Sequence, residues 1–364
     1  MGHHHFVFCA SIRHGQIVLK ADWLKYRLNF LRPSGTSRGV LDHKDSYFLR
    51  LTDDQGRSGV GECSLLPKLS PDLKGDVEAQ LDGICRDWLE GREPLDEHLA
   101  EFPALRFGVE MAKMDLQAER GRLFPSDFTD GLDRQAINGL IWMGSAEDMH
   151  QQIRSKMEEG FLVLKMKIGA IGFEEELALL KSIRSEYRPG EIQLRVDANG
   201  AFSPQEAADK LNRLFELHIH SIEQPIAAGQ WEEMARLCEL SPLDIALDEE
   251  LIGVQERGQR EALLDAIKPR YLILKPSLLG GFASCEEWIE LIEARVGGWW
   301  VTSALESNIG LSAIAQWNYT LHGFLASGLG TGGLFANNFD SPLSIVRGTL
   351  CFDPAKDLEK PAFK

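Results

Sequence analysis

The sequence predicts an α/β fold: a (β/α)8-type, TIM-like barrel with an N-terminal α+β capping domain. Three observations favour this fold. The chain has 364 residues, which is enough for one barrel with additions. From about residue 135, apolar strand-like runs alternate with helical segments. Before that point strand-like runs come first and helical spacing follows, which is typical of a small α+β domain.

Residues 15–64 are predicted to form strands joined by turns. Helical spacing of apolar residues follows over residues 72–91 and 103–121. Arg32–Asp45 is a polar segment too long for a simple hairpin loop, so we interpret it as a candidate functional flap. The expected strands are Ile17–Lys20, Tyr26–Leu31 and Tyr47–Leu51, with the turn Asp53-Asp54-Gln55-Gly56 leading to a returning strand at Gly59–Cys63.

Eight strand-like runs form the rest of the predicted fold, and they are spaced about one βα unit apart. Helical stretches such as Glu174–Ser185, Pro204–Phe215 and Trp231–Leu240 lie between them, the second opened by a Ser203-Pro204 start signal. Eight units predict a closed barrel. The runs are Ala136–Met143, Phe161–Ile168, Ile192–Val196, Ile219–Ile222, Ile245–Leu247, Tyr271–Leu274, Trp299–Ser303 and Leu321–Leu329.

An open, doubly wound sheet is the alternative to the barrel. Such a sheet more often carries a dinucleotide-binding loop after its first strand, and Gly139 to Gly144 offers none. We therefore expect a capping domain over residues 1–130 and a barrel over residues 131–334. Residues 335–364 are expected to pack back on the capping domain, without a long helix because three prolines interrupt them. Residues 1–5 resemble an expression tag and are left out of the site.

Composition and charge exclude several classes of function. Hydrophobic residues make up 44% of the chain and charged residues 26%, as in soluble globular proteins, and no apolar run is long enough to span a membrane. The net charge of −16 argues against a nucleic-acid partner, whereas a local pocket can still bind a small anion. Six scattered cysteines without a Cys-x-x-Cys pair predict free thiols in a reducing, cytoplasmic compartment. The oligomeric state stays open, a homo-oligomer included.

Ionisable residues end five consecutive predicted strands. In a barrel the carboxyl ends of all strands open on one face, where active sites lie. Each residue alone could be a helix cap or a surface charge. Because all of them stand at the same place, the carboxyl end of a strand, we predict that they share one site. They are Lys165 and Lys167 on the second strand, Asp197 on the third, Glu223 on the fourth, Asp248 on the fifth and Lys275 on the sixth.

The three carboxylates Asp197, Glu223 and Asp248 come from adjacent strands, so we expect them to meet. Clustered anions repel one another, and a hard divalent cation relieves that repulsion. Ligation by oxygen alone favours Mg²⁺, with Mn²⁺ as second choice, over zinc, which prefers His or Cys. Three separate salt bridges to Lys or Arg are the alternative.

The lysines predict proton-transfer chemistry. Lys165 and Lys167 are two residues apart on a strand and point to the same side. Each lysine is expected to lower the pKa of the other, and burial is expected to lower both. A lysine with a lowered pKa can act as a general base. Lys275 lies four strands away, on the opposite wall. The arrangement suits proton abstraction next to a carboxylate: Lys167 would take the proton, Lys275 would hold the intermediate or deliver a proton, and Lys165 would support them.

Two glycine-rich segments follow the last predicted strands. Ser303–Gly310 and Gly328–Gly333 are placed where backbone N–H groups often bind anions, although a tight turn is the alternative. The Gly-x-Gly-x-x-Gly pattern at 328 is weak evidence for a nucleotide, because it lies at the wrong end of the fold. The candidate substrate-binding residues are Arg38 in the flap, Asn199, Ser303, Glu306, Ser307, Gly330 and Thr331.

In combination, these motifs resemble the enolase superfamily, in its muconate-lactonizing-enzyme-like branch, over nearly the whole chain. The resemblance implies that the three acidic residues bind Mg²⁺ and that lysines on strands two and six abstract a proton α to a carboxylate. The motifs are Lys165-Met-Lys167, Val196-Asp197-Ala-Asn-Gly200, Ile222-Glu223-Gln-Pro225, Leu247-Asp248-Glu249 and Leu274-Lys275-Pro-Ser277.

Within that branch the chain is most similar to the o-succinylbenzoate synthase family. The resemblance implies a carbon-oxygen lyase that dehydrates 2-succinyl-6-hydroxy-2,4-cyclohexadiene-1-carboxylate to 2-succinylbenzoate in menaquinone biosynthesis. It implies Lys167 as base, Lys275 as the cation over the ring, a flap that closes on the substrate, and strand-seven and strand-eight loops that accept the succinyl end. Supporting residues are Ile137-Asn138-Gly139-Leu140-Ile141, Thr36-Ser37-Arg38-Gly39, Gly61-Glu62-Cys63-Ser64 and Ser303–Gly310.

Other enzymes of the superfamily are the alternatives: an N-succinylamino acid racemase, a dipeptide epimerase or a muconate cycloisomerase. Dipeptide epimerases resemble one another in an Asp-x-Asp pair after strand eight, and Gly330-Thr331-Gly332-Gly333 stands there in this chain. A non-catalytic metal-binding barrel is the alternative from another class. The presence of both Lys167 and Lys275 argues against it, because a binding module needs neither.

Overall fold

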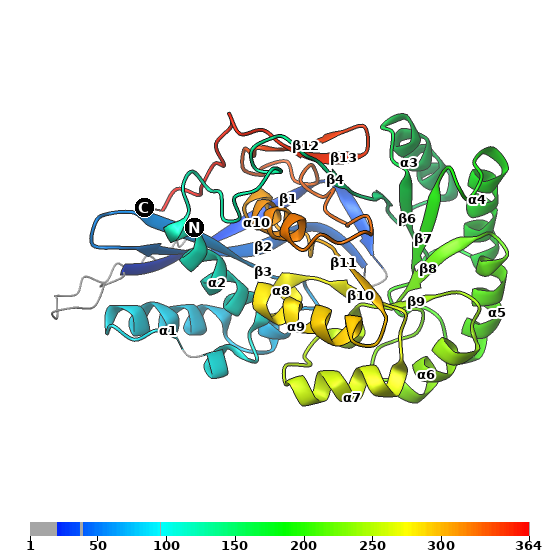
Figure 1. Cartoon of the computed structure of the whole chain (residues 1–364), viewed down its shortest axis with the longest axis horizontal. Coiled ribbons are helices and arrows are strands. Elements are labelled where there is room, and N and C mark those ends of the chain that lie inside the picture. The colour runs from blue at the N-terminus through cyan, green and yellow to red at the C-terminus, as the bar shows by residue number, and fades with distance from the viewer. Residues whose placement is uncertain (1–19, 37–38, 95, 364) are drawn as a thin grey trace.

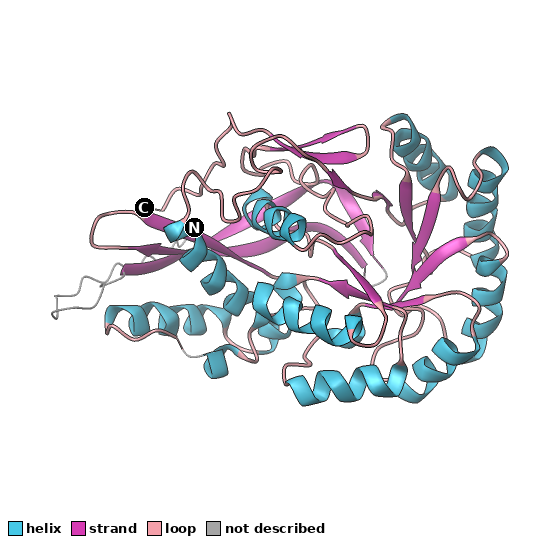
Figure 2. Cartoon of the chain, in the orientation of Figure 1, coloured by secondary structure: helices cyan, strands magenta, loops and turns pink. Residues whose placement is uncertain are grey.

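The structure is a computed structural model that describes residues 20–36, 39–94 and 96–363, with no side-chain description for residues 33–40 and 95–97. An antiparallel sheet with two helices forms the N-terminal unit, and a curled parallel sheet ringed by helices follows it (Figures 1 and 2). No helix in these ranges is long and apolar enough to cross a bilayer.

The N-terminal sheet has the order β1 (Lys20–Thr36), β2 (Gly39–Thr52) and β3 (Ser58–Ser64), all antiparallel. The predicted strand cores, the turn at Asp53–Gly56 and the returning strand are confirmed; the run at Ile17–Lys20 lies outside the described residues except for Lys20. The prediction of a loop at Arg32–Asp45 is wrong, because β1 and β2 continue pairing as far as Thr36 and Gly39. A two-stranded ladder satisfies its own backbone groups, so it needs no apolar alternation in the sequence.

Two helices pack on this sheet and form its core. They are α1 (Val77–Leu89) and α2 (Pro103–Gln117), with short 3₁₀ helices at Pro71–Lys74 and Asp96–Leu99. Three glycines let β3 approach α2 closely. A Cβ atom built on Gly61 would lie 1.9 Å from the carbonyl oxygen of Gly108, and one on Gly59 would lie 2.2 Å from that of Ala112. This contact requires glycine on the strand.

Seven of the eight predicted barrel strands form one parallel sheet, in which sequence order is spatial order. Their outer faces carry the apolar residues of a large core, such as Met166, Val196 and Ile222. The strands are β5 (Gly139–Ile141), β6 (Val163–Lys167), β7 (Gln193–Asp197), β8 (Ile219–Glu223), β9 (Ile245–Leu247), β10 (Tyr271–Leu274) and β11 (Gly298–Val301).

The helices between these strands cover the outer face of the sheet (Figure 2). The three helices predicted by range are confirmed, and Ser203 with Glu206 forms the capping box that begins one of them. The helices are α3 (Ala146–Glu158), α4 (Phe173–Glu186), α5 (Pro204–Phe215), α6 (Trp231–Leu240), α7 (Arg257–Ile267), α8 (Pro276–Leu279), α9 (Phe282–Glu293) and α10 (Asn308–Thr320), with a short 3₁₀ helix at Glu249–Leu251.

The eighth predicted strand, Leu321–Leu329, is wrong as a regular strand. Within it only Ser327 and Gly328 pair, one with Ile137 and the other with Thr302. The amide of Ser327 donates to the carbonyl of Ala136 at 3.0 Å, and that of Gly328 donates to the carbonyl of Val301 at 2.8 Å. A Cβ on Gly328 would lie 2.6 Å from the Thr302 side chain, so the approach depends on glycine. Two residues therefore close the ring between β11 and β5.

The C-terminal segment contacts both units. Strands β12 (Leu343–Val346) and β13 (Thr349–Phe352) form a small sheet with β4 (Gln135–Ala136). Residues 334–336 run beside β1, where Ala336 donates to Asn29 at 2.8 Å. Lys360 pairs with Asp115 on α2 at 2.6 Å. The predicted bounds at residues 130 and 334 stay a prediction.

Candidate active site

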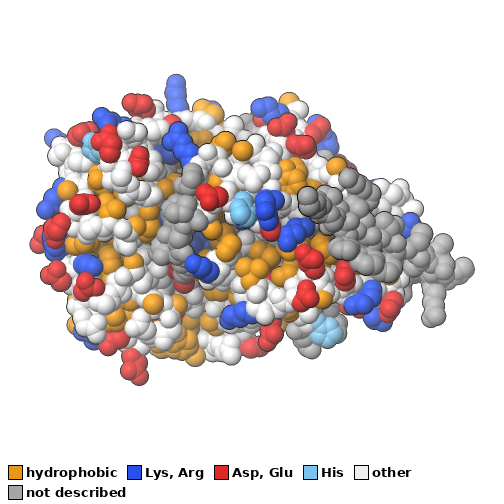
Figure 3. All heavy atoms as spheres, turned by 180° about the vertical axis from the view of Figure 1, so that it is seen from behind, with side chains coloured by type: hydrophobic (Ala, Val, Ile, Leu, Met, Phe, Trp, Pro, Cys, Tyr) orange, Lys and Arg blue, Asp and Glu red, His pale blue; other side chains and the backbone are white. Residues whose placement is uncertain are grey.

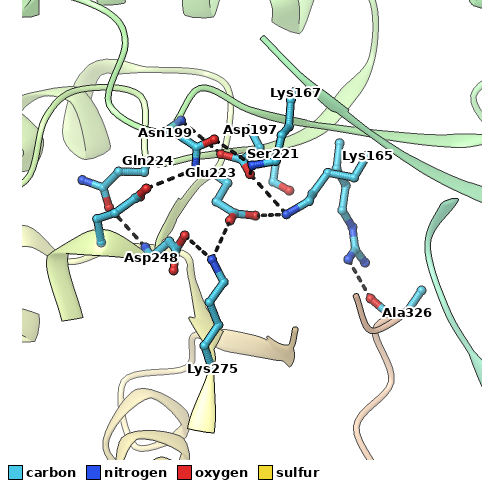
Figure 4. A network of polar contacts seen from close by, with 12 residues as sticks. Lys165, Lys167, Asp197, Asn199, Ser221, Glu223, Gln224, Asp248, Lys275 and Ala326 are labelled. Atoms are coloured by element: carbon cyan, nitrogen blue, oxygen red, sulfur yellow. Dashed lines mark hydrogen bonds and ion pairs between the residues drawn. The ribbon is translucent and has the colours of Figure 1, made fainter. Parts of the chain in front are cut away.

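The ionisable residues at the strand ends converge at the mouth of the barrel (Figure 4). The ladder itself sets their positions: Lys167 on β6 lies opposite Asp197 on β7, and Asp197 lies opposite Glu223 on β8. Asp248 and Lys275 directly follow β9 and β10. The carboxylates are buried, with 0%, 1% and 2% of Asp197, Glu223 and Asp248 exposed.

The Nζ atoms of three lysines lie among the three carboxylates. Lys165 Nζ lies 2.8 Å from Glu223 Oε2 and 3.3 Å from Asp197 Oδ2. Lys167 Nζ lies 2.9 Å from the same oxygen of Asp197. Lys275 pairs with Asp248 and lies 3.7 Å from Glu223 Oε1. Three lysines and three carboxylates thus contact one another in one buried cluster, with Glu249 beside it.

The electrostatics of this cluster differ from our expectation for Lys165. Burial favours the neutral amine, but the attraction of Glu223 and Asp197 outweighs it and raises the pKa of Lys165 above its ordinary value. The prediction of a lowered pKa is therefore wrong for this residue. Burial opposes ionisation of Asp197 too, yet Lys167 and Lys165 hold the pKa of its carboxyl well below the usual range. The pKa of Lys275 is also raised, because the carboxylates around it outweigh its burial.

Asn199 fixes Lys167 from the other side. Its Oδ1 accepts a hydrogen bond from Lys167 Nζ at 2.7 Å, and its Nδ2 donates to Glu249 Oε1 at 3.1 Å. The backbone of Asn199 is left-handed, with φ of 44°, a conformation that Asn tolerates better than most residues. The turn after β7 therefore holds Asn199 between Lys167 and Glu249.

A cavity of about 270 Å³ opens above the cluster. Its floor and one wall come from the barrel, and its cover comes from the N-terminal unit through Leu41 and the segment 66–69. The lining residues are Leu41, Leu66, Pro67, Lys68, Leu69, Asn138, Leu140, Trp142, Lys165, Lys167, Asp197, Asn199, Asp248, Glu249, Lys275, Thr302, Ser303, Ala304, Leu305, Gly328, Gly330 and Thr331.

The structure places some predicted substrate-binding residues at this cavity and others elsewhere. Asn199, Ser303, Gly330 and Thr331 line it. Glu306 does not line it: it is buried behind the wall, where its Oε2 accepts a hydrogen bond from Ser303 Oγ at 2.8 Å. Ser307 likewise lies behind the wall, as the N-cap of α10. Arg38 lies outside the described residues.

A buried polar network joins the N-terminal unit to the wall of the cavity. Glu62 on β3 accepts hydrogen bonds from Ser307 N at 2.9 Å, Ser307 Oγ at 2.6 Å and Gly310 N at 3.0 Å, all in the first turn of α10. Lys44 on β2 donates to the carbonyl of Leu305 at 2.8 Å, and burial lowers the pKa of its amine. This network fixes the segment 303–307 against the N-terminal sheet.

Sequence reasoning missed several residues of the site. Leu66, Lys68 and Leu69 cover the cavity, and Trp142 and Leu140 on the first barrel unit form an apolar wall. Among these residues, only Pro67-Lys68 could have been recognised in the sequence, as a turn, because proline favours turns. The others belong to apolar patterns that do not distinguish a cavity wall from a core.

The donor set at the mouth fits a hard divalent cation. All three carboxylates offer oxygen, which is what Mg²⁺ prefers. Glu223 Oε1 is buried without a hydrogen-bond donor, with only Lys275 at 3.7 Å. Within the described ranges, no three His, Cys, Asp or Glu side chains surround a common point as they stand, because lysines lie between the carboxylates.

Comparison with known proteins identifies the family. Residues 148–352 match the family described as enolase C-terminal domain-like, and residues 20–116 match the MenC N-terminal domain. The chain is 50% identical to the o-succinylbenzoate synthase of Desulfotalea psychrophila, over 90% of this chain and 98% of that protein. The chain belongs to the o-succinylbenzoate synthase family of the enolase superfamily. The alignment spans both structural units.

Solved structures of the enolase superfamily agree with this fold. The crystal structure of MenC from Desulfotalea psychrophila has a TM-score of 0.81 and 45% identity, over 92% of this chain and 99% of that one. A dipeptide epimerase from Enterococcus faecalis, complexed with Mg and the dipeptide L-Leu-L-Tyr, has a TM-score of 0.78 and 18% identity, over 93% and 97% of the two chains. That second likeness shows the fold alone. Enzymes of the superfamily use a divalent metal ion.

Proposed function

We infer that the chain is an o-succinylbenzoate synthase, a lyase that dehydrates 2-succinyl-6-hydroxy-2,4-cyclohexadiene-1-carboxylate to 2-succinylbenzoate for menaquinone. The observation that carries this inference is the 50% identity to a family member, over nearly the full length of both chains. The site supports it, since a small cavity has lysines and carboxylates along its floor. The free thiols of the five described cysteines suit a cytoplasmic enzyme.

We propose that Asp197, Glu223 and Asp248 hold the metal, Mg²⁺ or in its place Mn²⁺. When bound, the ion supplies positive charge that stabilises negative charge developing on the substrate carboxylate. Lys165, buried between Asp197 and Glu223, pairs with both carboxylates and holds them in position. This is the supporting role we assign to it.

The remaining residues carry the proton transfer. Lys167, aligned by Asp197 and Asn199, removes the proton from the ring carbon next to the carboxylate. Lys275, from β10 on the other side of the carboxylates, places a cation beside the ring and stabilises the enolate. The carbon–oxygen bond breaks, the hydroxyl group takes up a proton equivalent to the one that Lys167 removed and leaves as water, and the ring becomes aromatic. The small-molecule carboxylate is thus contacted from both sides.

The deciding experiment follows the absorbance of the cyclohexadiene with Mg²⁺ present. We expect the absorbance to disappear as 2-succinylbenzoate forms, and addition of a chelator should stop the reaction. Failure to consume the diene, together with racemisation of N-succinyl amino acids, would instead favour the racemase. The same lysines could support that reaction, whereas Gly330-Thr331-Gly332 in place of an Asp-x-Asp pair disfavours a dipeptide epimerase.

The metal assignment has a test that does not depend on turnover. Asp197→Asn should weaken Mg²⁺ binding at least about tenfold, measured by calorimetric titration of Mg²⁺ into the protein, because a neutral amide is a poorer ligand. Asp209→Asn, on the exposed face of α5, is the matched control. An unchanged titration of the Asp197 variant would reject the ligand assignment.

A further inference from the structure

A tight turn of the N-terminal unit, Leu66-Pro67-Lys68-Leu69, forms part of the cover over the cavity. The amide of Leu69 donates to the carbonyl of Leu66 at 3.1 Å, which closes a β-turn. Ser70 reinforces it, since its Oγ accepts from the amide of Leu66 at 2.8 Å. The backbone of the turn is thus held in place by its own hydrogen bonds.

Lys68 occupies a position in this turn that favours glycine. Proline at the second position has a negative φ, and Lys68 at the third has φ of 64°. That combination defines a type II turn, whose third residue is usually Gly or Asn. A lysine there costs backbone energy without stabilising the turn. Residues with such a backbone are enriched at functional sites, and this one lines the cavity.

The charges around the cavity point to that function. Four lysines line it. Three of them, Lys165, Lys167 and Lys275, form ion pairs with the carboxylates of the floor. Lys68 comes from the cover, on a different structural unit. A substrate with one carboxylate at the floor and a second on a flexible arm would therefore meet a cation at each end.

We propose that Lys68 binds the second carboxylate of the substrate, at the end of the succinyl arm, and so selects dicarboxylates. This inference rests on the proposed function, whose substrate carries two carboxylates. The polar groups of Ser303 and Thr331 form the part of the wall contributed by the barrel. Lys68 adds the charge that these hydroxyl groups lack.

The test compares two ligands that differ in the arm alone. We would measure inhibition of the full-length enzyme, with Mg²⁺ present, by 2-succinylbenzoate and by benzoate. Lys68→Met should raise the inhibition constant of 2-succinylbenzoate about tenfold, which is the usual size of one charge-assisted hydrogen bond. The constant for benzoate should stay the same. For the diene, KM should rise by a similar factor while kcat changes less than about twofold, because binding is lost equally from the ground and transition states.

Three further variants separate the loss of the Lys68 charge from a change in the stability of the turn. Lys68→Gly should show the same loss of affinity with an equal or higher melting temperature, since glycine suits the turn. Lys68→Arg should restore most of the affinity. Lys74→Met, at an exposed position outside the cavity lining, is the matched control and should change neither constant.

Two results would overturn the proposal: unchanged inhibition by 2-succinylbenzoate in Lys68→Met, or an equal loss for both ligands. A wild-type protein that leaves the diene intact would instead contradict the proposed function. In that case calorimetric binding of 2-succinylbenzoate still tests Lys68 separately.

Discussion

Lys167 shows how single residues of the site acquire their roles. Its Nζ lies between Asp197 Oδ2 at 2.9 Å and Asn199 Oδ1 at 2.7 Å, and both acceptors come from the end of β7 and the turn that follows it. One strand end thus supplies a metal-ligand candidate and the groups that orient the base. The side chain has a fixed direction before substrate arrives, which is a condition for efficient proton transfer.

Replacement of this lysine tests the assignment. Lys167→Met should lower kcat by about a hundredfold to ten-thousandfold, because a general base commonly contributes factors of 10² to 10⁴. Consumption of the diene measures the rate, and circular dichroism with Mg²⁺ titration checks that fold and metal site persist. Lys181→Met, on the exposed face of α4, should keep the normal rate. A Lys167 variant that retains near-normal kcat would remove the base assignment.

The sequence allowed the lysines and carboxylates to be found because a strand fixes direction: side chains two residues apart face the same way. It did not allow the pKa of Lys165 to be predicted, because its direction depends on distances to Glu223 and Asp197 that span separate strands. Nor could it separate Ser303, which lines the cavity, from Glu306, which lies behind it. Loop residues have no such periodicity.

At the scale of elements, α2 depends on a carboxylate from another segment. Phe102 at its N-cap provides no side-chain hydrogen bond. Asp72 supplies it instead, accepting from the amides of Ala104 at 3.1 Å and Leu105 at 3.2 Å. Burial raises the pKa of the Asp72 carboxyl from 3.8 to about 6, although these amides favour its ionised form. Ionisation of this group therefore opposes folding.

The pH dependence of stability follows from that shift. Between pH 3.8 and about 6 the folded chain keeps the proton that the unfolded chain has lost, so stability falls as pH rises and is constant again above 6. The free energy of unfolding of the wild type, relative to Asp72→Asn, should decrease by about 3 kcal/mol from pH 3.5 to 7. Urea titrations across this range measure it, with Asp54→Asn in an exposed turn as control. A difference that does not change with pH would contradict the assignment.

The elements that sequence reasoning misjudged share one physical cause. The hairpin at Arg32–Asp45 and the eighth barrel segment both pair through backbone groups with little apolar alternation. Ser327 and Gly328 close the ring with hydrogen bonds to neighbours far away in the chain, and such partners leave no local pattern. By contrast α5 and α6 were predicted by range, because amphipathic spacing is local.

At the scale of the whole molecule, the contact between the N-terminal sheet and the barrel includes a buried polar network. Glu62 satisfies two backbone amides and one hydroxyl group at the start of α10, and Ser46 donates to it from β2 at 2.9 Å. A buried helix end needs such acceptors. Seen from behind, the molecule has basic and acidic side chains interspersed over its surface (Figure 3). Apolar residues of the N-terminal unit, such as Phe48 and Phe107, also share one core cluster with the barrel.

Loss of Glu62 should therefore weaken the whole fold. Glu62→Ala leaves buried N–H groups without acceptors and should lower the free energy of unfolding by at least about 3 kcal/mol. Denaturant titration measures this change. Glu62→Gln keeps one acceptor oxygen, so its free energy of unfolding should fall by less. Glu101→Ala, at an exposed position, should leave the free energy of unfolding nearly unchanged. Equal stability of Glu62→Ala and the wild type would show that water replaces the carboxylate.

The strip of residues 334–336 beside β1 has a consequence for the order in which the protein can be made. β1 is an edge strand, and its partner Ala336 is encoded about 300 residues later. At roughly 5 to 20 residues per second, a ribosome needs about 15 to 60 seconds to reach it. During that time, β1 at the edge of the N-terminal sheet lacks the partner segment 334–336. The barrel that the sheet will cover is also incomplete. The catalytic cavity is therefore completed only near the end of translation.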